Sequence, residues 1–380
     1  MEFTNPLFRY RKEEERLLYS ENETISECMR ILVTLGKFFD ADRLIDIKSA
    51  HISGISYANI KDEGLEWLKS LKARFKVPTT INPAGMDMER WREMGIDYNF
   101  YLKQKEIIET FKRLGAETLL TCTPYYIKKV EFGEHIAWSE SSAVVYANSI
   151  LGAMTNKESG ISALAAAIIG KTPNYGLHIK ENRMPTILVK VKGDLSAAGY
   201  IAGESLSNEV PYFVFDRKVA KWELKLLGAS LASTGNVSMF HAEGITPEWR
   251  DFERPKERIE IEGKLDFDCD PDLIAIGCPH VSDDELKLIL DLIEGKRVKK
   301  ELWIFTSRDI VNRNRKIVEK IERLGAKVFC DTCIVVSTAC EKYDCVLVNS
   351  GKALHYLPKL RGVEVSFSDL KRCLDVATEG

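Results

Sequence analysis

Three cysteines stand at the carboxyl ends of expected strands, where thiols from separate loops could hold a metal ion or a cluster. They are Cys122, within the buried, strand-like run Ala116–Tyr126; Cys278, which closes the run Asp272–Cys278; and Cys333, which follows the strand expected at Ala326–Phe329. In open α/β sheets, sites lie beyond the carboxyl ends of the strands. Thiolates that converge from such loops can bind zinc or an iron–sulfur cluster. We therefore take these three residues as candidate metal ligands.

The same residues also have a plainer interpretation. A buried free cysteine commonly behaves as a small hydrophobic residue, and three thiolates are one fewer than a closed structural zinc site uses. Three would, however, suit a cluster that keeps one iron open. Cys330 precedes Cys333 in a C-x-x-C pattern, but it falls inside the expected strand, so we interpret it as a core residue. The remaining cysteines are interpreted as structural: Cys28, Cys269, Cys340, Cys345 and Cys373.

Several short polar loops could hold the anionic groups of a substrate. The first is expected to follow a strand at Leu44–Lys48, and it contains His51, Ser53, Gly54, Ile55 and Ser56. Its hydroxyls and backbone N–H groups suit a carboxylate or a phosphate. The other candidates are Asn82 with Pro83, Ser141, and the run Asn349–Lys352, in which Lys352 could pair with an anion. Each of these could instead be an ordinary cap or a solvated surface residue.

Composition indicates an ordinary soluble globular protein of two or three domains. Of the 380 residues, 45% are hydrophobic and 29% are charged, which is enough for well-buried cores. A net charge of −3 gives no basic surface for nucleic acid, and no run reaches the roughly 20 apolar residues of a membrane span. Residues 1–6 lack the apolar segment of an export signal. Nine cysteines, an odd number without such a signal, favour reduced thiols and a cytoplasmic location.

Strands alternate with helices along most of the chain, which predicts an α/β fold with parallel-sheet units. We expect a first α/β core region at 1–170, an inserted, smaller βαβαβ domain at 171–250 and a C-terminal α/β domain at 251–380. The charged, proline-containing segment Pro247–Gly263 is expected to be the linker that leads out of the inserted domain. Ser282 and Glu285 form a capping-box pattern, which predicts the start of a helix.

Together, several of these motifs resemble the aconitase X family. The most distinctive is the run Gly133–Ala153; the others are His51–Gly54, Thr121–Tyr125, Asp331–Cys333 and Asn349–Lys352. They occur in the family's order and span essentially the whole chain. The resemblance implies an aconitase-like, multi-domain α/β architecture and the activity of an iron–sulfur hydro-lyase.

The resemblance also implies a cofactor and a reaction. Cys122, Cys278 and Cys333 would hold a [4Fe–4S] cluster whose open iron acts as a Lewis acid on a 3-hydroxy acid. In archaeal members of the family, this chemistry dehydrates (R)-5-phosphomevalonate to trans-anhydromevalonate 5-phosphate in a modified mevalonate pathway. The loops at 54–56, at Asn82–Pro83 and at Lys352 would orient the carboxylate and the phosphate. The alternative activity is that of bacterial members, which dehydrate cis-3-hydroxy-L-proline.

Part of the site is expected on another chain. Members of the family combine a large catalytic part with a small swivelling domain, either fused or separate, and this sequence resembles the large part alone. The resemblance therefore implies a heterodimer with a separate small subunit, whose serine would be the general base. We assign no catalytic base in this chain. The competing, non-enzymatic hypothesis is a subunit whose thiols bind zinc for structure.

Overall fold

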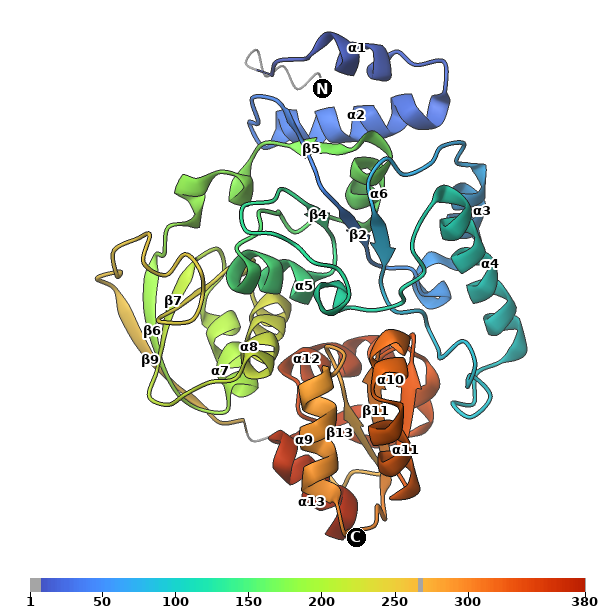
Figure 1. The fold of residues 1–380 in the computed structure, drawn as a ribbon, viewed down its shortest axis with the longest axis vertical. Helices are drawn as coiled ribbons and strands as arrows, with labels where there is room; N and C mark the ends of the chain where they lie inside the picture. Colours follow the sequence, from blue (N-terminus) through green and yellow to red (C-terminus); the bar gives the residue numbers. More distant parts are fainter. Residues whose placement is uncertain (1–7, 266–268, 380) are drawn as a thin grey trace.

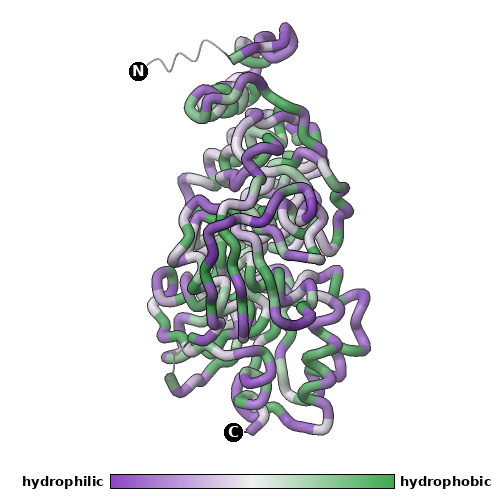
Figure 2. Tube along the Cα trace, turned by 90° about the vertical axis from the view of Figure 1, so that its left-hand side faces the viewer, coloured by the Kyte–Doolittle hydropathy of each residue, from purple (hydrophilic) through white to green (hydrophobic). Residues whose placement is uncertain are grey.

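The computed structural model describes residues 8–265 and 269–379, and it shows α/β regions that meet at a central junction (Figure 1). Residues 1–6, where we expected no export signal, lie outside the described residues. Parallel sheets with intervening helices confirm the predicted α/β class. Hydrophobic stretches are short and interrupted by hydrophilic residues along the coloured part of the trace (Figure 2). Accordingly, no helix in the described part of the chain is long and apolar enough to cross a membrane.

The N-terminal region contains two helices before its first strand and a three-stranded parallel sheet. Its elements are α1 (Lys12–Leu18), α2 (Glu23–Phe38), β1 (Leu44–Asp46), β2 (Ala50–Ile52), α3 (Tyr57–Ser70), β3 (Thr79–Ile81), α4 (Tyr98–Leu114), β4 (Ala137–Trp138), α5 (Ser141–Tyr146), α6 (Gly160–Ile169) and β5 (Lys171–Pro173). The strand order is β3-β2-β4, and both pairings are parallel. Helices α2, α3, α4 and α6 bury their apolar faces in one core with this sheet.

Two expectations about this sheet need correction. Strand β1, which we expected to lead into the first polar loop, pairs antiparallel with β5 instead. The loop follows β2, and His51 lies inside that strand. The run Ala116–Tyr126 is not a regular strand: its backbone meets the sheet only through an isolated bridge at Glu117 and one hydrogen bond from the Thr121 N–H to Ile81 of β3. Its end leaves the sheet because the Thr121 hydroxyl accepts the Thr123 N–H at 3.1 Å. This local hydrogen bond competes with the backbone hydrogen bonds between strands.

The middle region is a parallel sheet with helices between its strands, as expected. Its elements are β6 (Ile187–Gly193), α7 (Leu195–Ser205), β7 (Pro211–Phe215), α8 (Lys221–Thr234), β8 (His241–Ala242) and β9 (Arg258–Gly263), in the order β8-β7-β6-β9. The prediction that Pro247–Gly263 is entirely linker is wrong, because β9 pairs with β6 along its length. Ile259 and Ile261 pack into the core of this sheet, whereas the alternating charges made the segment look like a linker.

The C-terminal region is a five-stranded, wholly parallel sheet. Its elements are β10 (Leu273–Ile276), α9 (Asp283–Ile293), β11 (Glu301–Thr306), α10 (Arg308–Arg313), α11 (Arg315–Arg323), β12 (Lys327–Cys330), β13 (Cys345–Val348), α12 (Gly351–Arg361), β14 (Glu364–Phe367) and α13 (Leu370–Glu379). The order is β12-β11-β10-β13-β14. Helices α9, α11 and α13 pack on one face, and α12 packs on the other with residues 86–96 of the N-terminal region. The predicted capping box of Ser282 and Glu285 starts α9.

One pair of cysteines departs from the expectation of reduced thiols. Cys269 and Cys345 form a disulfide, with their Cα atoms 6.2 Å apart, within the range that a disulfide can bridge. The two residues are separated by 76 positions, so the sequence spacing gave no sign of their proximity. The other seven cysteines are free and buried.

Candidate functional site

The carboxyl ends of the N-terminal and C-terminal sheets meet at the junction. Just beyond β3, the Ala84 N–H donates to the Asp331 carbonyl at 2.7 Å, and Ser56 Oγ donates to the Val336 carbonyl at 3.3 Å. The C-terminal sheet reverses its winding direction between β10 and β13, which is where open parallel sheets place ligands. The candidates Cys278 and Lys352 follow these two strands, so both lie at the position that the topology favours.

The structure brings Cys122, Cys278 and Cys333 together at this junction. Their exposed fractions are 4%, 3% and 5%, and all three are free thiols. Burial raises the pKa of Cys122, to which nearby Cys333 also contributes. A hydrogen bond from Cys278 lowers the pKa of Cys333. Cys330 is the last residue of β12, as expected for a core position. Three thiols from three loops therefore interact with one another in a space sealed from solvent.

The three buried thiols are a donor set that would fit an iron–sulfur cluster. Within residues 8–265 and 269–379, no three His, Cys, Asp or Glu side chains form a group that could hold one metal ion. In a cluster each thiol binds a different iron, so the ligands need not surround one point. Three buried polar atoms on the adjoining loops also have no hydrogen-bond partner in the described chain: Tyr125 OH, Thr332 Oγ1 and Asn349 Oδ1. Buried polar groups are normally paired, so these atoms suit a polar cofactor with its substrate.

A buried chain of hydrogen bonds adjoins the thiols. Lys352 Nζ forms an ion pair with Glu140, and Asn82 Nδ2 donates to the other oxygen of that carboxylate at 2.7 Å. His51 Nε2 lies 3.1 Å from Asn82 Oδ1, and His51 Nδ1 lies 2.7 Å from Thr80 Oγ1. Because an amide oxygen only accepts, His51 donates from Nε2 and accepts the Thr80 hydroxyl proton at Nδ1. The chain thus orients the carboxylate that holds the lysine.

The charges of this group are fixed by burial and pairing. Burial lowers the pKa of His51 to about 4, so the ring is neutral. Burial opposes ionisation of Glu140, but the Lys352 ammonium outweighs it and holds the pKa of Glu140 at about 2. Burial likewise opposes ionisation of Lys352, whereas Glu140 and the thiols of Cys278 and Cys122 raise its pKa above the usual value. The lysine is therefore a permanent cation between a carboxylate and the thiols.

The remaining candidates surround this group less directly. Ser53 is joined to Ser139, because its N–H donates to Ser139 Oγ at 2.6 Å and its hydroxyl donates to Ser139 O at 3.1 Å. Gly54 adopts a left-handed φ of 78°, and no atom lies within 4 Å of the place a Cβ would take. Ser141 is half-buried at the start of α5, next to Glu140. Ile55 is buried in the loop that carries Ser53 and Ser56, and Pro83 is buried next to Asn82.

Comparison with known families decides what kind of protein carries this site. The chain matches the aconitase X first domain over residues 8–181, the second domain over 185–269 and the third domain over 271–379. The chain belongs to the aconitase X family. This confirms the family that the motifs around Cys122 and Lys352 predicted.

Two archaeal relatives of this aconitase X chain cover nearly its whole length. The phosphomevalonate dehydratase large subunit of Methanosarcina mazei is 49% identical over 97% of each chain. The protein of the same name from Methanocaldococcus jannaschii is 43% identical over 96% of this chain and 98% of that one. The holo-form crystal structure of Thermococcus kodakaraensis aconitase X has a TM-score of 0.89 and 42% identity, covering 97% of this chain and 100% of that chain. Cis-3-hydroxy-L-proline dehydratase of Pseudomonas aeruginosa is 32% identical over 97% of this chain and 69% of that protein.

Two residues of the aconitase X site were not selected as site residues from the sequence. Glu140 stood among many polar residues before α5, and its partner Lys352 is 212 positions away, so nothing in the sequence linked the two. His280 follows Cys278 by two positions and is fully buried between the cysteine loops. A histidine two positions after a strand-end cysteine was the only signal that could have found it.

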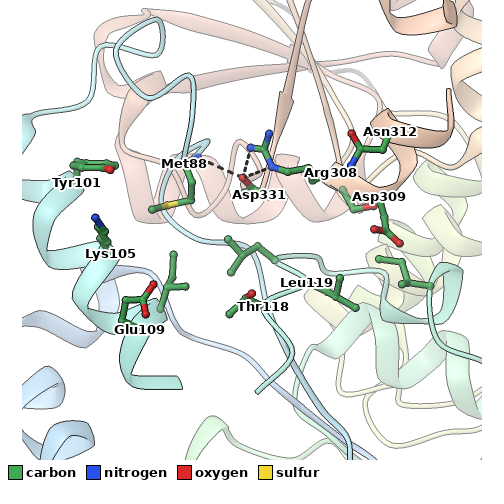
Figure 3. A pocket seen from close by; sticks show the side chains of 14 residues that line it. Met88, Tyr101, Lys105, Glu109, Thr118, Leu119, Arg308, Asp309, Asn312 and Asp331 are labelled. Carbon is green, nitrogen blue, oxygen red and sulfur yellow. Dashed lines mark hydrogen bonds and ion pairs between the residues drawn. The ribbon is translucent and has the colours of Figure 1, made fainter. Parts of the chain in front are cut away.

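Two pockets flank the aconitase X junction. One, of about 390 Å³, lies between α4 and α10, and Figure 3 shows Lys105 on one side of it and Arg308 with Asp331 on the other. The second, of about 380 Å³, is mainly apolar and is lined by the loop of Ser53, Gly54 and Ile55 together with side chains of α3 and α6. Neither of these two pockets is lined by any of the three site cysteines, so both are separate hollows beside the buried thiols.

The Glu140–Lys352 pair should make the stability of this aconitase X chain depend on acid pH. Because the pKa of Glu140 is about 2 instead of its ordinary 4.5, the stabilisation is complete above the ordinary value and is lost as the pH falls towards 2. The difference corresponds to about 3 kcal/mol. We expect the free energy of unfolding to fall by about that much more in the wild type than in the double variant Glu140→Gln/Lys352→Met. Urea denaturation at a series of acid pH values measures both slopes, and equal slopes would contradict the prediction.

Proposed function

We propose that this chain is the large subunit of a phosphomevalonate dehydratase. It would remove water from (R)-5-phosphomevalonate and form trans-anhydromevalonate 5-phosphate. Four archaeal relatives that carry this name support the proposal, because they are 43–49% identical over nearly the whole chain, and a fifth is 34% identical. The proline dehydratases are more distant, at 31–32% identity, so cis-3-hydroxy-L-proline is the less favoured substrate.

The observation that carries the proposal is the convergence of three buried thiols at the facing ends of two sheets. We propose that Cys122, Cys278 and Cys333 hold a [4Fe–4S] cluster, in which three cysteine ligands leave one iron without a protein ligand. Such an iron supplies a Lewis acid that stabilises a leaving hydroxide. The reaction removes a proton from the carbon next to the carboxylate and hydroxide from the 3-position, and the two leave as water with no net change in oxidation state.

The chain's own polar residues would bind and orient the substrate. The Lys352 ammonium acts on all three thiols in the direction that favours the thiolate, so it lies where an anionic cofactor and an anionic substrate would meet. Asn82 and Glu140 fix its position. The N–H of Ser53 is taken by Ser139, so the N–H groups of residues 54–56, beside the uncrowded Cα of Gly54, would be the ones that bind a carboxylate or a phosphate.

No side chain of this site is a convincing general base, since His51 is tied at both ring nitrogens and Glu140 is locked to Lys352. We therefore propose that the base belongs to a small partner subunit, in keeping with the large-subunit names of the relatives. The purified chain alone is expected to show no detectable dehydration of (R)-5-phosphomevalonate. Adding the small subunit should restore turnover, followed by product formation with mass spectrometry.

The controls of this assay separate the competing functions. Turnover by the single chain at the rate of the two-chain complex would refute the need for a partner. Preferential dehydration of cis-3-hydroxy-L-proline by the complex would assign the other activity. Anaerobic purification decides on the metal: a brown protein with broad visible absorption supports the cluster. A colourless protein with stoichiometric zinc would establish the structural zinc subunit instead.

A further inference from the structure

His280 is hydrogen-bonded to the loops of both other cysteines. It belongs to the loop of Cys278, and its side chain is completely buried. Its Nε2 lies 2.7 Å from the carbonyl of Thr332, the residue before Cys333. Its Nδ1 lies 3.0 Å from the hydroxyl of Thr121, the residue before Cys122. One imidazole therefore spans the three loops that carry the thiols.

The donor and acceptor roles of this ring are fixed by its partners. A backbone carbonyl only accepts, so His280 Nε2 carries the proton and donates to Thr332. Nδ1 must then accept, and the Thr121 hydroxyl donates to it. That hydroxyl oxygen also accepts the Thr123 N–H at 3.1 Å, which orients its proton towards the ring.

The main chain of His280 is engaged as fully as its ring. Its N–H donates to Cys122 Sγ at 3.3 Å, and its carbonyl accepts from Lys225 Nζ at 2.8 Å. Lys225 lies on α8 of the middle region, is itself buried, and is paired with Glu285 at 2.6 Å. Every polar atom of His280 thus has a partner, and these partners belong to the two other cysteine loops and to α8.

We propose that His280 is the positioning residue that sets the spacing of the three cysteine loops. The relevance of this spacing to catalysis rests on the proposed function. The spacing itself is set by hydrogen bonds within the protein alone. The residue acts through its neighbours and needs no contact with the reacting atoms. Residues that orient ligands in this way commonly change metal affinity by 10- to 100-fold when they are replaced.

The chain offers a matched control in another buried histidine. His241, in β8, is also fully buried, and its Nε2 lies 2.7 Å from the Arg183 carbonyl. Its Nδ1 has no hydrogen-bond partner in the described part of the chain, and it contacts none of the cysteine loops. Replacing His241 therefore reproduces the cost of losing a buried imidazole without disturbing the thiols.

The first measurement follows thiol accessibility in the full chain without added iron. His280→Leu and His241→Leu are labelled anaerobically with a thiol reagent, and each cysteine is quantified by mass spectrometry. In His280→Leu, we expect Cys122, Cys278 and Cys333 to label at least about tenfold faster than in the wild type, because two buried hydrogen bonds are lost. Cys28 and Cys373, which are buried in other cores, should be unaffected. His241→Leu should leave the three site thiols unchanged.

The second measurement follows the reconstituted two-subunit complex. His280→Leu is expected to lose iron to a chelator about 10- to 100-fold faster than the wild type, with an altered electron paramagnetic resonance signal of the reduced cluster. His280→Gln, whose amide can still donate to Thr332, and His280→Asn, whose amide can still meet Thr121, should each recover part of the difference. His241→Leu should release iron at the wild-type rate.

Different results overturn the two proposals separately. Labelling of the three thiols at the wild-type rate in His280→Leu would overturn the positioning role, as would an equal rise at Cys28 and Cys373, which would indicate general unfolding. A wild-type complex that takes up no iron would instead overturn the proposed cofactor. In that case, the labelling experiment would still decide whether His280 holds the loops together.

Discussion

Replacing Cys333 by serine is expected to abolish stable iron binding and to lower dehydratase activity about a thousandfold or more. A bound Lewis acid supplies several kcal/mol of transition-state stabilisation, and each 1.36 kcal/mol corresponds to about a factor of ten in rate. Cys333 is the residue whose thiolate the site favours, since a hydrogen bond from Cys278 lowers its pKa. A serine hydroxyl cannot replace that thiolate at neutral pH. Iron and sulfide analysis after anaerobic reconstitution, with steady-state turnover of the two-subunit complex, measures both losses.

Cys330→Ser is the matched control for this experiment. Cys330 lies three positions earlier, is 4% exposed, and ends β12 in the core. Both variants place a hydroxyl at a buried position, so they share the cost of burying a polar group, about 1–3 kcal/mol. We expect Cys330→Ser to be less stable but to keep its iron and its activity per folded molecule. Retention of full iron by Cys333→Ser would show that the ligand set is wrong.

Lys225→Met is expected to lower the free energy of unfolding by about 3–5 kcal/mol, the usual cost of breaking a buried ion pair from one side. Lys225 and Glu285 are 1% and 4% exposed, and their charged atoms are 2.6 Å apart. The lysine also holds the His280 carbonyl at 2.8 Å, so its loss leaves a carboxylate and a carbonyl unpaired inside the protein. The midpoint and slope of urea denaturation, followed by circular dichroism, measure the change.

Two further variants test the reason for that loss. In Lys225→Met/Glu285→Gln the uncompensated charge is removed while an amide can still cap α9, so most of the lost stability should return. Lys190→Met breaks an exposed pair, in which Lys190 and Glu260 side chains are 50% and 71% exposed, and surface pairs contribute little. An equal loss in Lys190→Met and Lys225→Met would contradict the argument from burial.

Local signals predicted much of the fold. Strand β12 lies where the run before Cys333 predicted a strand, and the capping box at Ser282 starts α9. Cysteines at strand ends led to the junction because parallel strands deliver their carboxyl ends to one edge. These inferences depend on residues close in sequence, for which short-range geometry is sufficient.

Contacts between residues far apart in the sequence account for the features that could not be predicted. Strand β9 was misread because an edge strand with one solvated face carries charges between its isoleucines. The charge on Lys352 suggested that its side chain was free to bind an anion. In the structure it forms an ion pair with Glu140, which connects the ends of two different sheets. His280 gains its importance from Thr121 and Thr332, which approach it only after the two sheets have met. Each of these features is a property of tertiary contact.

The origin of the three thiols has a consequence for the lifetime of the protein. Cys122 belongs to the N-terminal region, whereas Cys278 and Cys333 belong to the C-terminal sheet, so a cofactor bound to all three would cross-link two independently built cores. By mass action, a ligand that binds only the assembled state stabilises that state by its own binding free energy. Loss of the proposed cluster in air would therefore also weaken the interface between the N-terminal and C-terminal cores and expose it to proteases. Turnover of the polypeptide in the cell would then follow the oxidative damage of its cofactor.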